Sequence, residues 1–183
     1  MNLFLTGERG VGKTTLLHKI LATLPLRPAG FWVSRDLGPN GRPLAFYLND
    51  YLSGERRLMA KVSGAEGRPP VAVPGIFTGF GADCLEAAQD SPLVVLDELG
   101  LMEEGSPRFI AAVHELLDRS GYNPHRLTLG VLRLCEGNFV RSIRERKDVT
   151  VVTVAAHNRD ALLQPLTAAI AENFTGNESL GRS

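Results

Sequence analysis

The stretch Gly7-Glu8-Arg9-Gly10-Val11-Gly12-Lys13-Thr14 decides the fold that this sequence predicts. It matches the pattern Gly-x-x-x-x-Gly-Lys-Ser/Thr at every fixed position. An apolar run at residues 3–5 precedes it and an amphipathic helical pattern follows it. In such a loop the glycines let the backbone wrap closely, so that its N–H groups and the start of the next helix point at phosphate oxygens. The stretch therefore predicts a binding site for the phosphates of a nucleotide.

The predicted phosphate-binding residues form one continuous set: Gly7, Glu8, Arg9, Gly10, Val11, Gly12, Lys13, Thr14 and Thr15. We expect Lys13 to act as a catalytic point charge that reaches the β- and γ-phosphates, and the Thr14 hydroxyl to bind Mg²⁺. Arg9 is predicted to point outward, and Thr15 to serve the following helix. Glu8 places a negative charge beside the phosphates, for which the residue pattern offers no reason.

A second acidic element follows a buried strand. Residues 93–96 form a continuous apolar run of the parallel-strand type, and Asp97 and Glu98 come directly after it. Asp97 is predicted to hold Mg²⁺ through water, and Glu98 to be the catalytic base that orients and deprotonates the attacking water. Two other roles stay open for Glu98, because it could cap a helix or pair with an arginine.

Phosphoryl transfer also calls for positive charge at the γ-phosphate. The cations Arg141, Arg144, Arg146 and Lys147 cluster on a helix predicted before the last strand, and Arg141 and Arg144 share a face of it. Arg144 is the predicted catalytic member of this cluster. The alternative, a solvated helix face without chemistry, stays open.

Base recognition has weaker signals. No Asn-Lys-x-Asp run follows a late strand, so the residues of guanine-specific recognition are missing. A base could stack on Arg159 or bond to Asn158, although Asn158 suits the N-cap of the closing helix equally well. Phe31 and Trp32 could also stack on a base, or they could pack inside the protein.

The remaining pattern alternates strands and helices. A helix is predicted from residue 13 to 24, where Pro25 stops it, and three alternating runs within 31–62 predict an antiparallel meander. Residues 63–70 are predicted as a flexible linker. Further strands are expected at 71–78, 93–96, 126–132 and 149–154, with helices at 81–90, after Ser106-Pro107, around 139–147 and around 162–170. This order predicts a doubly wound, mainly parallel sheet with the meander on one edge.

Composition limits the class of protein. With 44% hydrophobic and 22% charged residues, we expect one domain over 1–173 and a frayed tail at 174–183. The 20 basic and 20 acidic residues balance, which argues against strong nucleic-acid binding. Cys84 and Cys135 suit reduced thiols. With no leader and no long apolar run, we expect a cytoplasmic protein that does not bind membranes, and no protein partner is indicated.

From residue 3 to about residue 166 the sequence resembles the THEP1-type, or cancer-related, nucleoside-triphosphatase family. The resemblance is carried by residues 4–7 and 10–15, Gly30-Phe31, residues 95–100 with Met102-Glu103, residues 143–149, and Asn158-Arg159 followed by Leu162-Leu163. The most specific parts are Asp-Glu-Leu-Gly-x-Met-Glu at 97–103 and Arg-x-Arg-Lys-Asp-Val at 144–149. Two positions depart from the family pattern, because Leu101 stands where a lysine is usual and Glu8 where a small residue or proline is usual.

The resemblance implies an α/β fold of the P-loop NTPase type, a three-layer sandwich with a mainly parallel sheet. It also implies Mg²⁺-dependent hydrolysis of ATP, GTP, CTP and UTP to the diphosphate and phosphate, with loose base selectivity. Gly12, Lys13 and Thr14 carry over as phosphate and metal ligands, Asp97 as the Mg²⁺ residue and Glu98 as the base. Two alternatives remain: a P-loop nucleoside or nucleotide kinase, and a nucleotide-dependent switch or binding subunit.

Overall fold

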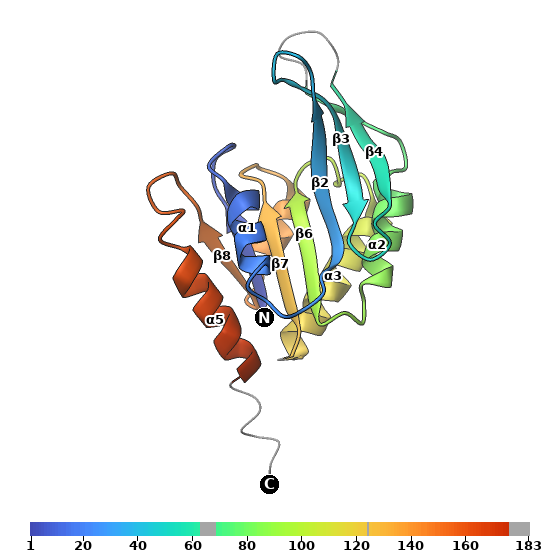
Figure 1. The fold of residues 1–183 in the computed structure, drawn as a ribbon. Coiled ribbons are helices and arrows are strands. Elements are labelled where there is room, and N and C mark those ends of the chain that lie inside the picture. Colours follow the sequence, from blue (N-terminus) through green and yellow to red (C-terminus); the bar gives the residue numbers. More distant parts are fainter. Residues whose placement is uncertain (63–68, 124, 176–183) are drawn as a thin grey trace.

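An eight-stranded sheet forms the centre of the molecule, as seen in a computed structural model that describes residues 1–62, 69–123 and 125–175 (Figure 1). Its strand order is β5-β4-β3-β2-β6-β7-β1-β8. The strands are β1 (Asn2–Thr6), β2 (Ala29–Leu37), β3 (Pro43–Asp50), β4 (Arg56–Lys61), β5 (Val71–Ala72), β6 (Leu93–Leu99), β7 (Leu127–Leu132) and β8 (Val149–Thr153).

Strand β2 joins a parallel half of the sheet to an antiparallel half. It pairs in parallel with β6, and the parallel pairs β6–β7, β7–β1 and β1–β8 continue from there. On its other side β2 pairs antiparallel with β3, which continues to β4 and β5. The predicted parallel sheet with an antiparallel meander at one edge is therefore confirmed.

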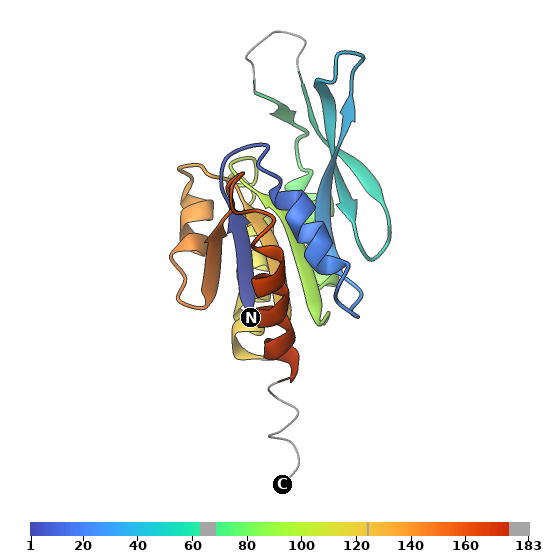
Figure 2. The same cartoon turned by 60° about the vertical axis from the view of Figure 1, so that its left-hand side comes forward.

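Helices cover both faces of the sheet and make the three predicted layers (Figures 1 and 2). Helices α1 (Lys13–Leu21) and α5 (Leu163–Thr175) lie on one face, and α2 (Ala82–Ala87), α3 (Pro107–Tyr122) and α4 (Asn138–Arg144) on the other. Two apolar clusters separate the layers. One contains Leu16 and Ile170 from the first pair of helices, and the other contains Phe109 and Phe139 from the second set.

The buried strand β6 explains why both faces need helices. Val94 and Leu96 belong to one apolar cluster, and Leu93 and Val95 to the other, and none of the four is exposed. A strand that is apolar on both sides must be covered on both sides, as is usual for parallel sheets. This burial places Asp97 and the residues after it at the carboxyl edge of the sheet, where the loop after β1 also lies.

Three predicted elements need correction. The strand predicted at 71–78 ends at Ala72, because Pro74 and Gly75, with φ of 75°, turn the chain. A π-helix over Phe77–Gly81 follows and buries Phe77 of the supposed strand together with Phe80, and α2 is shorter than the predicted 81–90. Helix α1 ends at Leu21 rather than 24, since i to i+3 turns follow.

Two other predicted helices end at different residues in the structure. Helix α4 ends at Arg144, so Arg146 and Lys147 lie beyond it. Helix α5 reaches Thr175, two residues into the predicted tail. The predicted linker at 63–70 lies largely outside the described residues, as does most of the tail. Within the described ranges, no helix is long and apolar enough to cross a membrane.

Candidate active site

The loop between β1 and α1 wraps closely because its glycines adopt conformations that other residues rarely adopt. The φ angles of Gly7, Gly10 and Gly12 are 134°, 84° and 96°. A Cβ on Gly7 would collide with the carbonyl oxygen of Val154, and one on Gly12 would lie 2.7 Å from Arg159 Cδ. Glycine is therefore required at position 7, where the loop passes the Val154 backbone, and the positive φ angles favour glycine at all three positions.

Lys13 is held inside the curve of this loop. Its ammonium group donates hydrogen bonds to the carbonyl oxygens of Gly7 (2.9 Å) and Glu8 (2.8 Å), and the residue is only 8% exposed. Burial lowers the pKa of Lys13, and the nearby Glu98 carboxylate opposes that shift. Because an ammonium has three protons, one donor stays available for a phosphate oxygen.

Thr14 and Asp97 face each other across the loop and the end of β6. The Thr14 hydroxyl donates to Asp97 Oδ1 at 3.1 Å. Asp97 is 2% exposed, and its other oxygen, Oδ2, has no hydrogen-bond partner among the described residues. Burial raises the pKa of Asp97 to about 7, although the Thr14 hydrogen bond opposes this shift.

This oxygen pair fits a hard divalent cation. Mg²⁺ keeps several waters and takes few protein ligands, which are usually one or two oxygens beside substrate phosphates. The unpartnered Asp97 Oδ2 is the kind of buried acceptor that such an ion or its water would satisfy. Among the described residues no group of three or more His, Cys, Asp or Glu could hold a metal. An ion at Thr14 and Asp97 would therefore need oxygens from a bound ligand.

Glu98 pairs with an arginine that the sequence interpretation missed. Arg133 Nε lies 3.2 Å from Glu98 Oε1, and both side chains are partly exposed. The Arg133 amide donates to the Leu99 carbonyl at 2.9 Å, which fixes its backbone beside β6. A Cβ on Gly100 would lie 2.5 Å from Arg133 Cδ, so glycine leaves room for the arginine. Of the roles left open for Glu98, pairing with an arginine is the one seen in the structure.

Glu103 supports the turn that follows β6. It is 4% exposed, and its Oε2 accepts a hydrogen bond of 3.0 Å from the Gly100 amide. Burial raises the pKa of Glu103 to about 7, while hydrogen bonds to the backbone oppose the shift. This buried carboxyl therefore helps to set the position of the backbone between Glu98 and the start of α3.

One cavity of about 660 Å³ unites the loop with the acidic end of β6. It is bounded by the loop, by the β6 and β7 ends and by the meander. Its lining residues are Gly7, Glu8, Arg9, Gly10, Gly12, Lys13, Thr14, Thr15, Val33, Ser34, Arg35, Phe46, Met59, Pro70, Asp97, Glu98, Gly100, Leu101, Met102, Glu103, Arg133 and Leu134.

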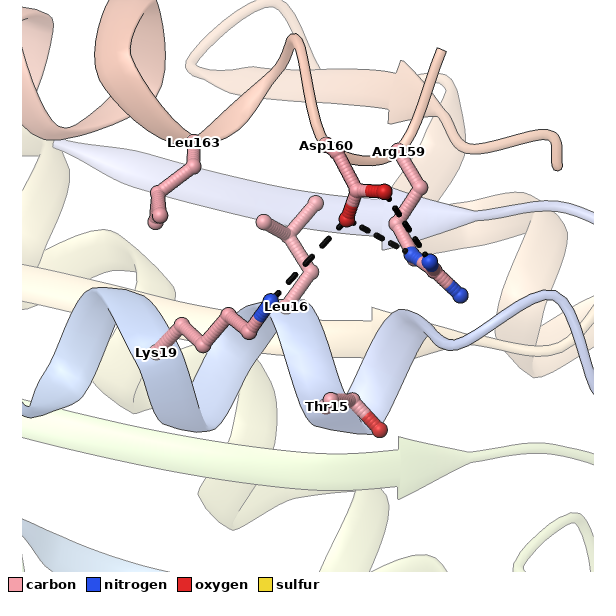
Figure 3. A pocket seen from close by; sticks show the side chains of 6 residues that line it. All are labelled: Thr15, Leu16, Lys19, Arg159, Asp160 and Leu163. Carbon is pink, nitrogen blue, oxygen red and sulfur yellow. Dashed lines mark hydrogen bonds and ion pairs between the residues drawn. The ribbon is translucent and has the colours of Figure 1, made fainter. Parts of the chain in front are cut away.

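A second, smaller cavity of about 190 Å³ lies between α1 and the chain before α5 (Figure 3). Its lining residues are Thr15, Leu16, Lys19, Arg159, Asp160 and Leu163. Arg159 donates two hydrogen bonds of 3.1 Å to Asp160, and Lys19 Nζ lies 3.9 Å from the same carboxylate. Arg159 also lies against Gly12, so this cavity adjoins the phosphate-binding loop.

Most predicted site residues meet in these cavities, but Val11 and Arg144 do not line either of them. Two other cations of the predicted cluster are engaged elsewhere, because Arg141 pairs with Glu136 and Arg146 pairs with Asp118 and Asp148. The role predicted for Arg144 stays a prediction. Arg133 could have been found from its position directly after the buried strand β7, the relation that Asp97 has to β6.

The four residues considered for base binding differ in whether they line a described cavity. Phe31 is fully buried against Phe109. Trp32 makes an edge contact with His18 and lines neither described cavity. Asn158 accepts from the Ala155 amide and donates to the Thr153 carbonyl, so it caps a local turn and not α5, which begins at residue 163. Arg159 alone of this group reaches a cavity.

Comparison with known proteins gives consistent matches over nearly the whole chain. A family model described as NTPase matches residues 2–167. The nucleoside-triphosphatase THEP1 of Thermofilum pendens is 35% identical over 178 residues, covering 93% of this chain and 95% of that protein. The cancer-related nucleoside-triphosphatase of Homo sapiens is 32% identical over 190 residues, covering 92% and 96%.

Solved structures agree with the fold. The crystal structure of THEP1 from Aquifex aeolicus matches with a TM-score of 0.71 at 23% identity and covers 93% of this chain and 99% of that chain. The solution structure of a human cancer-related nucleoside triphosphatase matches with a TM-score of 0.69 at 30% identity, covering 92% and 96%. The first likeness concerns the fold alone.

Proposed function

This chain belongs to the NTPase family of THEP1-type and cancer-related nucleoside-triphosphatases, and from that premise we propose that it hydrolyses nucleoside triphosphates to diphosphates and phosphate. One observation carries the proposal beyond the family name. The loop around Lys13 and Thr14 lines the same cavity as Asp97 and Glu98. Phosphate binding, metal binding and a base are the three parts that hydrolysis of a triphosphate requires.

The proposed reaction depends on Mg²⁺. Thr14 Oγ1 and Asp97 would hold the ion, which supplies charge neutralisation at the β- and γ-phosphate oxygens when bound. The 3.1 Å hydrogen bond between these two residues and the unpartnered Asp97 Oδ2 support this assignment. The Lys13 ammonium would donate its third hydrogen bond to an oxygen of the same phosphates.

Glu98 is the proposed base. It lines the cavity beside the loop and is partly exposed, so water reaches its carboxylate. In the proposed step Glu98 orients a water molecule and accepts its proton as the oxygen attacks the γ-phosphorus. Arg133, held against Glu98, is the cation we propose to approach the γ-phosphate when nucleotide binds.

The smaller cavity is the proposed site of the base and sugar. It adjoins Gly12 and Thr15 of the loop, and its walls combine the planar Arg159 guanidinium with the aliphatic Leu16 and Leu163 (Figure 3). A guanidinium plane can stack on any base, because stacking uses the ring face and not the hydrogen-bonding edge. This arrangement supports loose selectivity among ATP, GTP, CTP and UTP.

A cytoplasmic location completes the proposal. The two cysteines support it, since Cys84 and Cys135 are both free thiols, as is usual in a reducing compartment.

The test is phosphate release from ATP, GTP, CTP and UTP, each measured with Mg²⁺ and with excess chelator. Lys13→Ala should weaken triphosphate binding and abolish release, because it removes the charge at the β- and γ-phosphates. Lys61→Ala is the matched control, since Lys61 is exposed on β4 and lines neither described cavity. Full activity of Lys13→Ala would overturn the site assignment, and equal release with chelator would overturn the role of Mg²⁺.

A further inference from the structure

The larger cavity extends well beyond the phosphate-binding loop. Strands β2, β3 and β4 project past the ends of β6 and β7 (Figures 1 and 2), and their inner face forms a wall of the cavity through Val33, Phe46 and Met59. At about 660 Å³, the cavity lies within the range of sites for drug-sized ligands. A triphosphate on the loop whose base and sugar occupy the smaller cavity would leave the meander wall free for another ligand.

The part of the larger cavity between the meander wall and the turns after β6 and β7, called the extension below, is apolar on two sides. Phe46 and Met59 form the meander side, and Met102, Leu101 and Leu134 form the side built by the turns after β6 and β7. Leu101 and Leu134 are 51% and 63% exposed, which is unusual for large apolar side chains that line one cavity. Two methionines and a phenylalanine make a surface suited to an aromatic ring, because thioether and ring faces both contact planar groups well.

The meander wall also carries a cation, Arg35, that has no ion-pair partner among the described residues. Arg35 lies opposite Phe46 in the β2–β3 register, and its side chain lines the cavity. It makes no ion pair with any residue that the structure describes. Arg56 of the same meander does pair, with Asp36 at 2.7 Å, and it does not line the cavity. A free guanidinium beside an apolar wall favours a ligand that carries a carboxylate or phosphate.

We propose that this extension binds a second substrate, an aromatic alcohol that carries an anionic group, and that its hydroxyl accepts the γ-phosphoryl group of the bound triphosphate. The ring would lie between Phe46 and Leu101, and the anionic group at Arg35. The inference rests on the proposed function, because it needs a triphosphate on the loop and Glu98 beside it. It adds phosphoryl transfer to an organic acceptor as an activity of this chain.

The transfer step balances without another reactant. The acceptor oxygen forms a bond to the γ-phosphorus as Glu98 takes the hydroxyl proton. The bond between the γ-phosphorus and the β,γ-bridging oxygen breaks, and its electron pair leaves with the nucleoside diphosphate. The products are a phosphate monoester and the diphosphate, and Glu98 then releases its proton to solvent.

The Glu98 carboxylate, which lies where the phosphoryl group would be transferred, favours an alcohol over a phosphate as the acceptor. A carboxylate beside the nucleophile repels an anionic phosphate oxygen, whereas it can accept the proton of a hydroxyl group. The anionic part of the acceptor is therefore assigned to Arg35 and not to Glu98.

The probe is 4-(hydroxymethyl)benzoate, an aromatic alcohol with a carboxylate, compared with benzyl alcohol, which lacks the charge. Each is added at millimolar concentration to enzyme, Mg²⁺ and ATP. Phosphorus NMR then quantifies inorganic phosphate and the phosphate ester as separate signals. We expect ester from the carboxylate probe, and at least fivefold less from benzyl alcohol.

The measured quantity for variants is the ratio of ester to inorganic phosphate, because a merely destabilised protein loses both products together. Arg35→Gln should lower this ratio at least fivefold, and the control Arg56→Gln should keep it. Phosphate release without any ester overturns the acceptor proposal and leaves hydrolysis standing, and a probe that only slows phosphate release does the same. If ATP binds but neither product forms, the proposed function itself fails, and the acceptor proposal with it.

Discussion

The guanidinium of Arg133 lies 3.2 Å from the Glu98 carboxylate, at the point where the phosphate-binding loop faces the end of β6. Two neighbouring parallel strands supply this pair, since Glu98 belongs to β6 and Arg133 follows β7 directly. The pair places a cation next to the proposed base without help from another subunit. A triphosphate on the loop would bring its γ-phosphate toward both groups.

Arg133→Gln should lower the turnover number by about 10²-fold, because loss of one donor to the developing charge costs about that much in other enzymes. Nucleotide affinity should change far less, since the loop stays intact. The measurement is phosphate release at saturating ATP, with the sequence-predicted Arg144→Gln as the comparison. A large loss in Arg144→Gln with full activity in Arg133→Gln would reverse the two assignments.

Asp97→Asn should weaken the dependence of nucleotide binding on Mg²⁺. Replacing a carboxylate that holds the ion through water is expected to cost about 10- to 100-fold in metal affinity. Calorimetric titration of a non-hydrolysable triphosphate at several Mg²⁺ concentrations gives this value without relying on turnover. Asp36→Asn, which alters an exposed partner of Arg56, is the control. An unchanged Mg²⁺ dependence in Asp97→Asn would remove Asp97 from the metal site.

Arg159→Ala should weaken binding of all four nucleoside triphosphates by about tenfold, as expected for loss of one base-stacking contact. Inorganic tripolyphosphate has no base, so its affinity should stay the same. Arg119→Ala, in an arginine that pairs with Glu115 on α3, serves as the matched control. Equal losses for tripolyphosphate and ATP would place Arg159 at the phosphates and not at the base.

Glu103→Gln should change how stability depends on pH. The pKa of Glu103 is raised from 4.5 to about 7 in the folded protein, so folding favours the protonated carboxyl. Its contribution to the free energy of unfolding is present below pH 4.5 and is lost as the pH rises toward 7. The loss is on the order of 2–3 kcal/mol, at about 1.4 kcal/mol per pH unit.

Gln at position 103 keeps an acceptor for the Gly100 amide but does not ionise. Urea unfolding at pH 5 and pH 8 should therefore show a smaller fall in stability for the variant than for the wild type. Asp97, whose pKa is also raised to about 7, acts in the same direction in both proteins and cancels from the comparison. An identical fall in both proteins would show that Glu103 does not titrate as described.

The local patterns were enough to predict the sheet and the glycine-rich loop between β1 and α1. The run at 93–96 is apolar at every position, and such a short run is typical of a strand covered on both faces. The three alternating runs within 31–62 likewise predicted the meander. In these segments the local preference and the tertiary environment agree.

The segment after residue 71 shows why other predictions failed. Phe77 was predicted to lie in a strand, but it is buried in the core within a π-helix, where its ring packs on that of Phe109 in α3. Distant packing overrode the local pattern there. The Arg133–Glu98 pair was missed for a related reason, since it joins two strands whose adjacency is a property of the sheet order.

The central claim is that Glu98 activates water for hydrolysis of a triphosphate held by the loop. The most direct measurement compares phosphate release from ATP by the wild type and by Glu98→Gln, with nucleotide affinity measured for both. The account predicts equal affinity and a loss of roughly 10²- to 10⁴-fold in rate for the variant. A variant that binds and hydrolyses at the wild-type rate would contradict it, as would a wild type that binds ATP with Mg²⁺ and releases no phosphate.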